Sequence, residues 1–241
     1  MEGDGNASTG KLYRTVYFSG WVPVTGAEGP RRRGEQRRGE ELRRHILFVA
    51  KDVFLESGYE RASMDAVAAR AGTSKRSLYA HFESKDKLFL AVLGLIRELY
   101  LGRLRTPDAY ADDPAEAVAL FCDRFLRLMV WEPQVQTCRL SMAGAERQPE
   151  HAHAYFDAVF ASAYERLAAY LSERYGLEGA EAPALAEDLL GRTVLPRLFR
   201  TLLGIEPAAK EPPAEAPAAE GAELDAIRRL VAAALPGGAA G

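Results

Sequence analysis

Apolar residues recur at helical spacing along the chain from residue 40 onward. Between residues 40 and 57 they lie three or four positions apart, at Leu42, Ile46, Val49 and Val53. This spacing places them on one face of an α-helix. Gly58 follows at a point where helices commonly end in a left-handed residue, so the pattern predicts a first helix over residues 40–57.

Two short helices are predicted next, over residues 64–71 and 75–82. Each follows a serine in the position of an N-cap, Ser63 for the first helix and Ser74 for the second. Only the three-residue turn that begins at Gly72 separates them. Two helices joined by so short a turn, with another helix before them, are typical of a helix-turn-helix.

The helical pattern continues beyond these elements without a competing strand pattern. A connecting helix, capped by Ser84, is expected over residues 84–105. The longer helices that follow have start and stop signals at Asp113-Pro114, Pro133, Pro149 and Gly176. Pro133 and Pro149 each restart a helix, and the second of these helices runs without a break to Gly176.

The last two helices are expected over about 184–203, broken or bent at Pro196, and over about 223–235. The segment 206–222 between them is rich in Ala, Pro and Glu and is typical of a loop. The predicted fold class is therefore all-α. A helix-turn-helix domain over 40–83 is followed by the connecting helix and by a helical-bundle domain over 106–241.

Composition excludes several classes of protein. The chain has 241 residues, enough for a packed core, and its two cysteines, Cys122 and Cys138, are too few for a disulfide framework. No apolar run approaches the ~20 residues that span a bilayer. The start of the chain lacks the pattern of a secretory signal. We therefore expect a cytoplasmic protein with no membrane partner. Residues 1–39 contain scattered Gly, Ser, Thr, Asp and Pro without an apolar period, so they are expected to form a disordered extension.

The formal net charge of −3 hides an uneven distribution of charge. Residues 31–105 have 17 basic and 10 acidic side chains, whereas residues 106–241 have 12 basic and 21 acidic ones. The first segment is thus at +7 and the second at −9. A basic segment joined to an acidic one indicates that a polyanion binds the first segment alone.

The helix over 75–82 has the features of a DNA-reading helix. In a helix-turn-helix the later helix enters the major groove of double-stranded DNA. Here that helix opens with polar and cationic residues, among which Arg76 has the planar fork that reads guanine through two hydrogen bonds. Leu78 and Phe82 are expected on its opposite face, in the core.

Three stretches between Ile46 and Leu93 form a more specific motif. They read F-x-x-x-G-Y, S-M-D-x-V-A-x-x-A-G and S-K-R-S-L-Y-x-H-F-x-S-K-x-x-L-F. Their order and spacing resemble the tetracycline-repressor (TetR/AcrR) family of transcriptional regulators. The resemblance implies contacts with operator DNA from Ser63, Thr73, Ser74, Lys75, Arg76, Ser77, Tyr79, His81 and Lys85.

The resemblance also makes residues 106–241 a regulatory and dimerisation domain. The stretch FLRLMVWEPQVQTCRLSMAGAERQPEHAHAYF, which begins at Phe125, resembles the regulatory part of AefR-like members. It implies a pocket between helices for an unknown small hydrophobic or amphipathic inducer. For each single candidate the sequence favours a place in the plain core over one in the pocket. The candidate lining residues are Phe121, Phe125, Met129, Met142, Phe156 and Phe160.

A homodimer is expected because a single helix-turn-helix reads few bases, so that dimers span two half-sites of a palindromic operator. The resemblance places the dimer contact in the two C-terminal helices. Their apolar stripe comprises Leu189, Leu190, Val194, Leu198, Leu202, Ile227, Leu230 and Val231. The expected function is a repressor that the inducer releases from the operator by favouring a dimer that does not fit DNA.

Five arginines precede the first predicted helix: Arg31, Arg32, Arg33, Arg37 and Arg38. One interpretation is a charged, flexible leader. The other is an arm that reaches the DNA backbone or the narrow minor groove.

No enzyme motif, cofactor or metal site is predicted. His151 and His153 stand two positions apart, so on a helix they point to different faces, and no carboxylate or cysteine cluster supports them as ligands. Cys122 and Cys138 fit buried packing better than a redox pair. The alternative function is a nucleoid-associated or architectural DNA-binding protein without a ligand, whose regulatory core would be filled.

Overall fold

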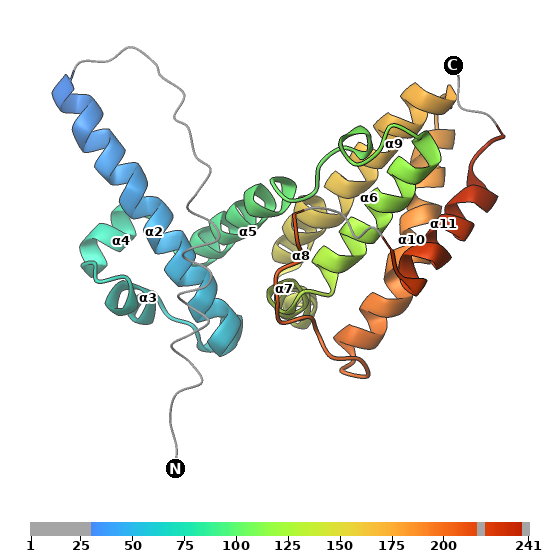
Figure 1. Cartoon of the computed structure of the whole chain (residues 1–241). Helices are drawn as coiled ribbons and strands as arrows, with labels where there is room; N and C mark the ends of the chain where they lie inside the picture. Colours follow the sequence, from blue (N-terminus) through green and yellow to red (C-terminus); the bar gives the residue numbers. More distant parts are fainter. Residues whose placement is uncertain (1–29, 216–219, 238–241) are drawn as a thin grey trace. The chain divides into compact units, whose positions relative to one another are not determined.

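The computed structural model describes residues 30–215 and 220–237, and these are almost entirely helical (Figure 1). Within these ranges no strand forms, and a single β-bridge pairs Trp131 with Ala209. The chain divides into two compact units after Arg44. The described part of the first unit is the start of helix α2 (Pro30–Arg61), and the other elements belong to the second unit.

Helix α2 begins ten residues earlier than the predicted start at residue 40. Pro30 is suited to a first helical position, and the Arg, Glu and Gln residues that follow it are good helix formers. Arg37 also donates to Glu41 one turn later, with 3.1 Å between Nε and Oε1. Residues 30–39 are therefore helical rather than disordered, while the remainder of the predicted extension, residues 1–29, lies outside the described residues.

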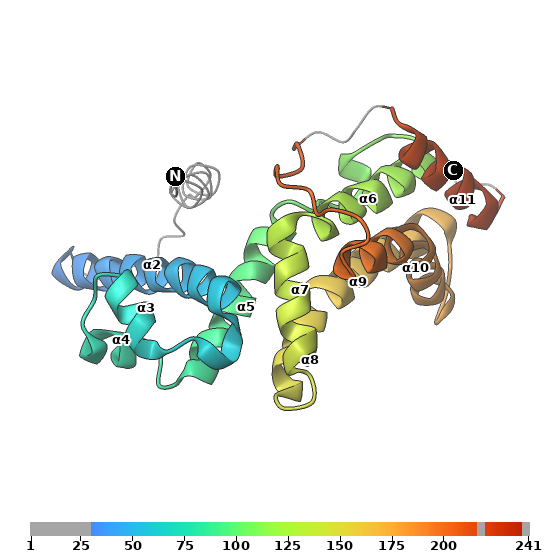
Figure 2. The same cartoon turned by 90° about the horizontal axis from the view of Figure 1, so that it is seen from below.

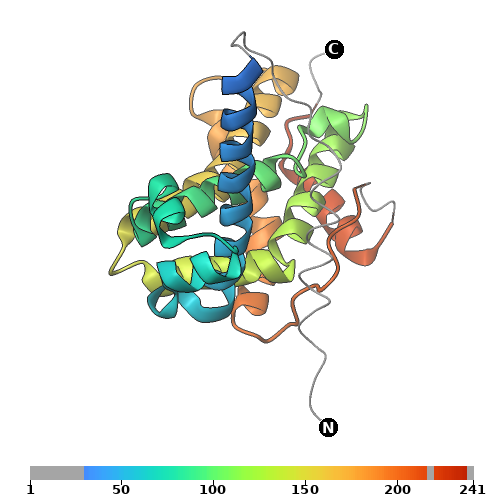
Figure 3. The same ribbon diagram turned by 90° about the vertical axis from the view of Figure 1, so that its left-hand side faces the viewer.

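The expected helix-turn-helix is present as α3 (Met64–Arg70) and α4 (Lys75–His81), two short helices that meet at a sharp turn (Figures 1 and 3). Gly58, with φ of +76°, interrupts the helical backbone of α2, and Gly72, with φ of +62°, makes the turn between α3 and α4. Both values lie in the region that favours glycine. The predicted end of the first helix and the predicted turn are thus confirmed.

Serine caps set the starts of the short helices, as the sequence predicts. The Ser63 hydroxyl accepts from the backbone N–H of Ala66, and the Ser74 hydroxyl accepts from that of Ser77, both at 3.1 Å. Ser84 caps α5 (Lys85–Leu101) in the same way. Helix α5 ends at Leu101, four residues before the predicted boundary at 105.

The core beneath α3 and α4 is built from α2, α4 and α5. Phe54 of α2 meets Phe89 of α5 edge to face, with 4.9 Å between the ring centroids. Leu78 and Phe82 are buried in this core, as predicted. The start of α5 therefore belongs to the same packed unit as α4, which it follows directly in the chain.

The C-terminal part is a helical bundle. Its main helices are α6 (Pro114–Met129), α9 (Ser162–Tyr175), α10 (Glu181–Leu202) and α11 (Ala222–Ala234). Helix α10 packs against α9 and α6, and α11 packs against α6 (Figures 1 and 2). Asp113 caps α6 and Gly176, in the left-handed region, ends α9, both as predicted.

Helices α7 (Glu132–Gly144) and α8 (Pro149–Phe156) pack against each other. The sequence predicts one continuous helix from Pro149 to Gly176. The structure instead inserts a π-helical turn, η2 (Asp157–Ala161), between α8 and α9. A π-turn has no clear signature in hydrophobic spacing, and such turns frequently mark functional sites.

Two further differences concern the end of the chain. Helix α10 starts at Glu181, three residues early, and runs through Pro196 without a break. A proline inside a helix costs about 3 kcal/mol, and the buried apolar face of α10 offsets that cost.

A short 3₁₀ turn, η1 (Pro107–Ala109), precedes α6. None of the described helices has the length and apolar character needed to cross a bilayer.

Candidate nucleic-acid interface

Helix α4 presents one face to the core and the other to solvent. Leu78, which has no exposed surface, fixes the inner face. Lys75 and Arg76 are exposed on the outer face, at the start of the helix, and Thr73 and Ser77 beside them are half-buried. The structure therefore places the predicted recognition residues on one surface of the helix-turn-helix.

Ser63 and Ser74 each cap a helix and keep a hydrogen-bond donor for a further partner. Each hydroxyl already accepts the N–H of its helix start through one lone pair. A hydroxyl also has one O–H donor, which the cap does not use. Both serines are exposed, so each O–H can still donate to a phosphate oxygen.

The two cations of α4 differ in their surroundings. Lys75 pairs with Asp65 of α3, with 2.6 Å between Nζ and Oδ2, and both side chains are exposed. No ion pair or hydrogen bond joins Arg76 to an acidic side chain among the described residues, in contrast to Lys75. The Arg76 guanidinium is thus available for a base edge without breaking an ion pair first.

Tyr79 and His81 lie near the end of α4. The Tyr79 side chain is 48% exposed, which is unusual for a large aromatic residue and leaves its hydroxyl accessible. His81 is half-buried, and its ring lies 6.4 Å from that of Phe82. Their predicted approach to the DNA backbone stays a prediction.

Lys85, also predicted to contact phosphate, is engaged by the protein itself. Its ammonium donates to the carbonyl oxygens of Tyr59 at 3.0 Å, Ala62 at 3.2 Å and Glu60 at 3.3 Å. It also lies 4.4 Å above the centre of the Tyr59 ring. These carbonyls follow the interruption at Gly58, so Lys85 closes the C-terminal end of α2. The predicted phosphate contact would compete with these bonds.

The arginine arm is only partly described. Arg37 and Arg38 are exposed on α2, and Arg37 pairs with Glu41. The backbone of Arg31, Arg32 and Arg33 is helical, but their side chains lie outside the described residues. A helical arm differs from the flexible leader or arm expected from the sequence, and its contact with DNA stays a prediction.

The candidate pocket residues separate into two groups. Phe121, Phe125 and Met129 are fully buried in the core along α6. Met142, Phe156 and Phe160 line a hollow of about 240 Å³ between α7, α8 and α10. The hollow is almost entirely apolar, and its rim is open because Met142 and Phe156 are about half exposed.

Hydrophobic spacing in the sequence does not identify most of the residues of α7 and α10 that line this hollow. Leu198, assigned to the dimer stripe, lines it, and so does Phe199 beside it. The hydroxyl of Ser141, also in the lining, is buried without a hydrogen-bond partner among the described residues. A ligand with one polar group would satisfy that hydroxyl.

Most of the predicted dimer stripe is used inside the chain. Leu189, Leu190, Val194, Leu198, Ile227 and Val231 are all at most 3% exposed in the single chain. Only Leu202 and Leu230 of the stripe remain half-buried. Large apolar side chains are instead exposed at the end of α10, at Phe199, Leu203 and Ile205.

Both cysteines are buried, and neither forms a disulfide. Burial raises the pKa of Cys122 to about 12 and also raises the pKa of Cys138. The reactive thiolate is therefore scarce at neutral pH, which favours the interpretation of packing over that of a redox pair.

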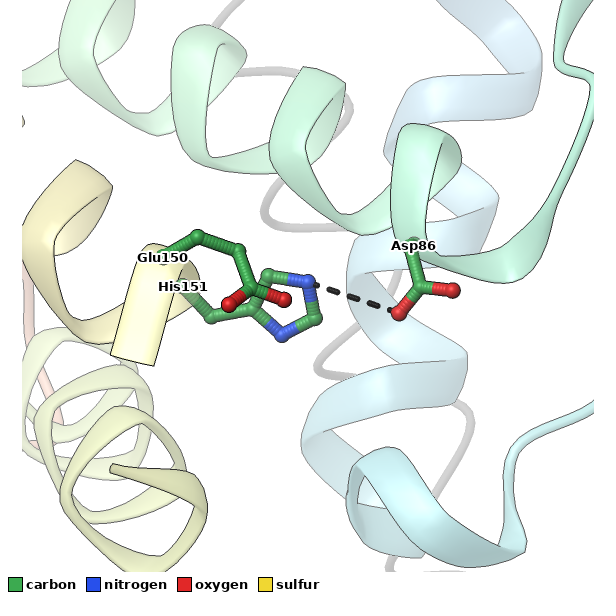
Figure 4. A group of neighbouring side chains, drawn as sticks. All are labelled: Asp86, Glu150 and His151. Atoms are coloured by element: carbon green, nitrogen blue, oxygen red, sulfur yellow. Dashed lines mark ion pairs between the residues drawn. The ribbon is translucent and has the colours of Figure 1, made fainter. Parts of the chain in front are cut away.

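A cluster outside the helix-turn-helix joins α2, α5 and α8. His151 of α8, which is 2% exposed, packs its ring against Tyr59 and Phe89, at 5.0 and 4.7 Å between centroids. Its Nε2 lies 3.7 Å from Oδ1 of Asp86, the contact drawn in Figure 4, and the Tyr59 hydroxyl donates to the same oxygen. Burial lowers the pKa of His151, so the imidazole is neutral at pH 7.

The carboxylate of Glu150 completes this cluster (Figure 4). Sequence spacing could not find the group, because Asp86 and His151 are far apart in the chain and on different helices. Spacing along one helix pairs His151 only with His153, two positions away. His153 is in fact exposed and outside the cluster.

Two family models match consecutive parts of the chain. Residues 46–92 match the model described as bacterial regulatory proteins, tetR family. Residues 116–177 match the model described as the C-terminal domain of an AefR-like transcriptional repressor. The first match covers the helix-turn-helix, and the second covers α6 to α9.

Curated relatives match mainly the N-terminal part. The HTH-type transcriptional activator FasR of Mycolicibacterium smegmatis is 49% identical over 65 residues, which are 27% of this chain and 30% of FasR. The chain thus matches about a third of the length of such relatives.

Solved structures extend the likeness to about four fifths of the chain. The flavonoid-responsive regulator FrrA aligns with a TM-score of 0.63 and 25% identity, over 81% of this chain and 94% of FrrA. A putative tetR-family regulator from Mesorhizobium loti aligns with a TM-score of 0.62 and 20% identity, over 82% of this chain and 95% of that one.

Proposed function

Because the chain belongs to the tetR family of bacterial regulatory proteins, we propose that it is a sequence-specific transcriptional repressor that a small-molecule inducer releases from a palindromic operator. One observation carries this proposal. Arg76 stands exposed and without an acidic partner among the described residues, on a recognition helix whose other face is locked in the core by Leu78.

In the proposed complex α4 lies in the major groove. Arg76 reads a base edge, and a good bidentate contact of this kind discriminates by about 1–3 kcal/mol. The exposed hydroxyls of Ser63 and Ser74 donate to backbone phosphates, which fix the position of the helix without reading sequence. Such a regulator would act in the cytoplasm, on the nucleoid, and we assign it no catalytic role.

The operator is proposed to bind a homodimer. Two copies related by two-fold symmetry place two recognition helices about one or more turns of DNA apart. The proposed contact uses the surfaces of α10 and α11 that the single chain leaves exposed, since most of the apolar stripe between them is already buried. Two exposed apolar side chains just after α10, Leu203 and Ile205, fit such a contact.

The inducer is proposed to occupy the hollow between α7, α8 and α10. Its apolar lining fits a hydrophobic or amphipathic molecule, and the buried Ser141 hydroxyl provides one polar contact. The name of FrrA describes that protein as flavonoid-responsive. A ligand that prefers the dimer with poorly placed recognition helices lowers DNA affinity, typically by a coupling of ~1–3 kcal/mol.

Selection of binding sites from a pool of random duplex DNA tests this function. The full-length protein is expected to enrich a palindrome, with two protein chains on each duplex. A pool that stays random would overturn sequence-specific binding and favour the alternative, an architectural DNA-binding protein. Enrichment of a single half-site by a monomer would overturn the proposed dimer.

A further inference from the structure

The first turns of α5 and α8 bring three ligand-type side chains together. Asp86 comes from α5, and Glu150 and His151 come from α8. One oxygen or nitrogen atom from each lies within 4.8 Å of the other two. Figure 4 shows the imidazole directed toward the Asp86 carboxylate, with the Glu150 carboxylate beside it.

His151 has an unusual position for a histidine without a ligand. Its side chain is 3% exposed, yet Nε2 has no hydrogen-bond partner among the described residues. The 3.7 Å to Asp86 Oδ1 is too long for a hydrogen bond. A buried polar atom without a partner costs about 1–3 kcal/mol, so its occurrence calls for an explanation.

We propose that Asp86, Glu150 and His151 bind a divalent first-row transition ion, of which Zn²⁺ is the best fit. Imidazole nitrogen suits zinc and its neighbours in the series, whereas Mg²⁺ and Ca²⁺ prefer oxygen ligands alone. Three protein ligands leave a fourth, tetrahedral position for water.

One distance in the cluster is already close to the separation that zinc needs. Bonds of about 2.0–2.1 Å in a tetrahedron place neighbouring ligand atoms about 3.3 Å apart. The observed 3.7 Å between His151 Nε2 and Asp86 Oδ1 is near this value. All three ligand atoms lie within 4.8 Å of one another, and because both carboxylates are exposed, they can rotate to close the remaining gap. The rings of Tyr59 and Phe89 hold the imidazole, and the Tyr59 hydroxyl orients Asp86 from outside the ligand set.

An ion at this location would also affect DNA binding, an inference that rests on the proposed function. Helix α5 begins four residues after α4 ends, and α8 lines the hollow proposed for the inducer. An ion bound to both helices would join the recognition element to the ligand-binding element. If the ion prefers one arrangement of the two, it changes operator affinity as a second effector.

Titration calorimetry on the full chain tests the site directly. The protein is freed of a histidine tag, treated with a chelator and titrated with Zn²⁺ or, separately, with Mg²⁺. We expect one Zn²⁺ per chain, a higher melting temperature with Zn²⁺, and no comparable response to Mg²⁺. Asp86→Asn, Glu150→Gln and His151→Gln should each weaken Zn²⁺ binding by about tenfold or more.

Matched controls distinguish this site from other groups on the surface. His153→Gln and Glu146→Gln change exposed side chains of the same types outside the cluster and should leave Zn²⁺ affinity unchanged. Because Asp86 and Glu150 are exposed, their variants remain informative even if the His151 variant fails to fold. Absence of stoichiometric binding, or equal binding by all variants, would overturn the site.

The calorimetry requires no DNA, so its outcome is independent of the proposed function. Operator binding with and without Zn²⁺ is measured separately, on the duplex selected above. Zn²⁺ binding without any change in operator affinity would overturn the coupling and retain the site. Failure to select an operator would overturn the proposed function and leave the metal result standing.

Discussion

Asp65 in α3 pairs with Lys75 at the start of α4, with 2.6 Å between the carboxylate oxygen and the ammonium nitrogen. The pair bridges the turn between the two helices of the proposed DNA-reading surface. Both side chains are exposed, and such pairs are worth about 0–1 kcal/mol, so a phosphate can compete for Lys75. The carboxylate nevertheless places a negative charge on the surface that would face DNA.

Asp65→Asn should therefore tighten operator binding several-fold. The change frees Lys75 and removes repulsion between Asp65 and phosphate. One additional phosphate contact would also steepen the dependence of log affinity on log salt by about 0.9. Fluorescence anisotropy at several salt concentrations measures both quantities. Glu173→Gln, which makes the same charge change at an exposed site on α9, is the control, and weaker binding by the Asp65 variant would contradict the prediction.

Lys85→Ala should lower stability more than it lowers DNA affinity. Removing the ammonium leaves the carbonyls of Tyr59, Glu60 and Ala62 without their shared donor. Hydrogen bonds to a charged group contribute about 1.5–3 kcal/mol, so the melting temperature should fall by several degrees. Lys87→Ala, at an exposed neighbouring position, should leave it unchanged.

Thermal unfolding without DNA and anisotropy well below the melting temperature distinguish the two roles of Lys85. An unchanged melting temperature together with a reduced salt dependence of binding would show that Lys85 contacts phosphate in the complex. That outcome would contradict the capping role that the structure gives it.

Cys122 should resist thiol reagents in the folded protein. Its pKa, raised to about 12 by burial, leaves very little thiolate at pH 8, and no solvent reaches the sulfur. Ellman's reagent should react slowly with both cysteines in the native state and quickly after unfolding. Rapid native reaction, or loss of DNA binding after mild oxidation that a reductant reverses, would restore the redox interpretation of Cys122 and Cys138.

Ala152→Phe should fill part of the hollow between α7, α8 and α10. Fluorescence of the apolar dye anilinonaphthalene sulfonate should fall relative to the unmodified protein, while operator affinity without inducer is retained. Ala169→Phe adds the same side chain at an exposed position on α9 and serves as the control. Equal dye binding by all three proteins would place the dye elsewhere and argue against the hollow as a ligand site.

Local signals in the sequence predict the helix-turn-helix well. Ser63, Ser74 and Ser84 cap their helices as expected because an N-cap depends on a hydroxyl and the next few residues. Gly58 and Gly72 are similarly local, since each adopts a backbone conformation that other residues avoid. The all-α fold follows from the same short-range information.

The parts that could not be predicted depend on contacts between distant segments. Hydrophobic spacing finds Leu189 and Val194 on one face of a helix, but does not show whether α6, α9 and α11 or a second chain will cover that face. The proximity of Asp86 to His151 has the same origin, because only the folded chain brings α5 and α8 together. The motif implies a phosphate contact for Lys85. The hydrogen bonds of its ammonium to carbonyl oxygens of α2 could not be predicted either, because they also join segments that are distant in the chain.

We propose above all that α4 reads DNA sequence through Arg76. The most direct measurement compares affinity for the selected operator with affinity for a scrambled duplex, for the unmodified protein and for Arg76→Ala. Because Arg76 is exposed, the variant should keep its melting temperature and lose about 1–3 kcal/mol of discrimination for each base pair it reads. A folded Arg76→Ala protein that still prefers the operator by the original ratio would contradict the claim.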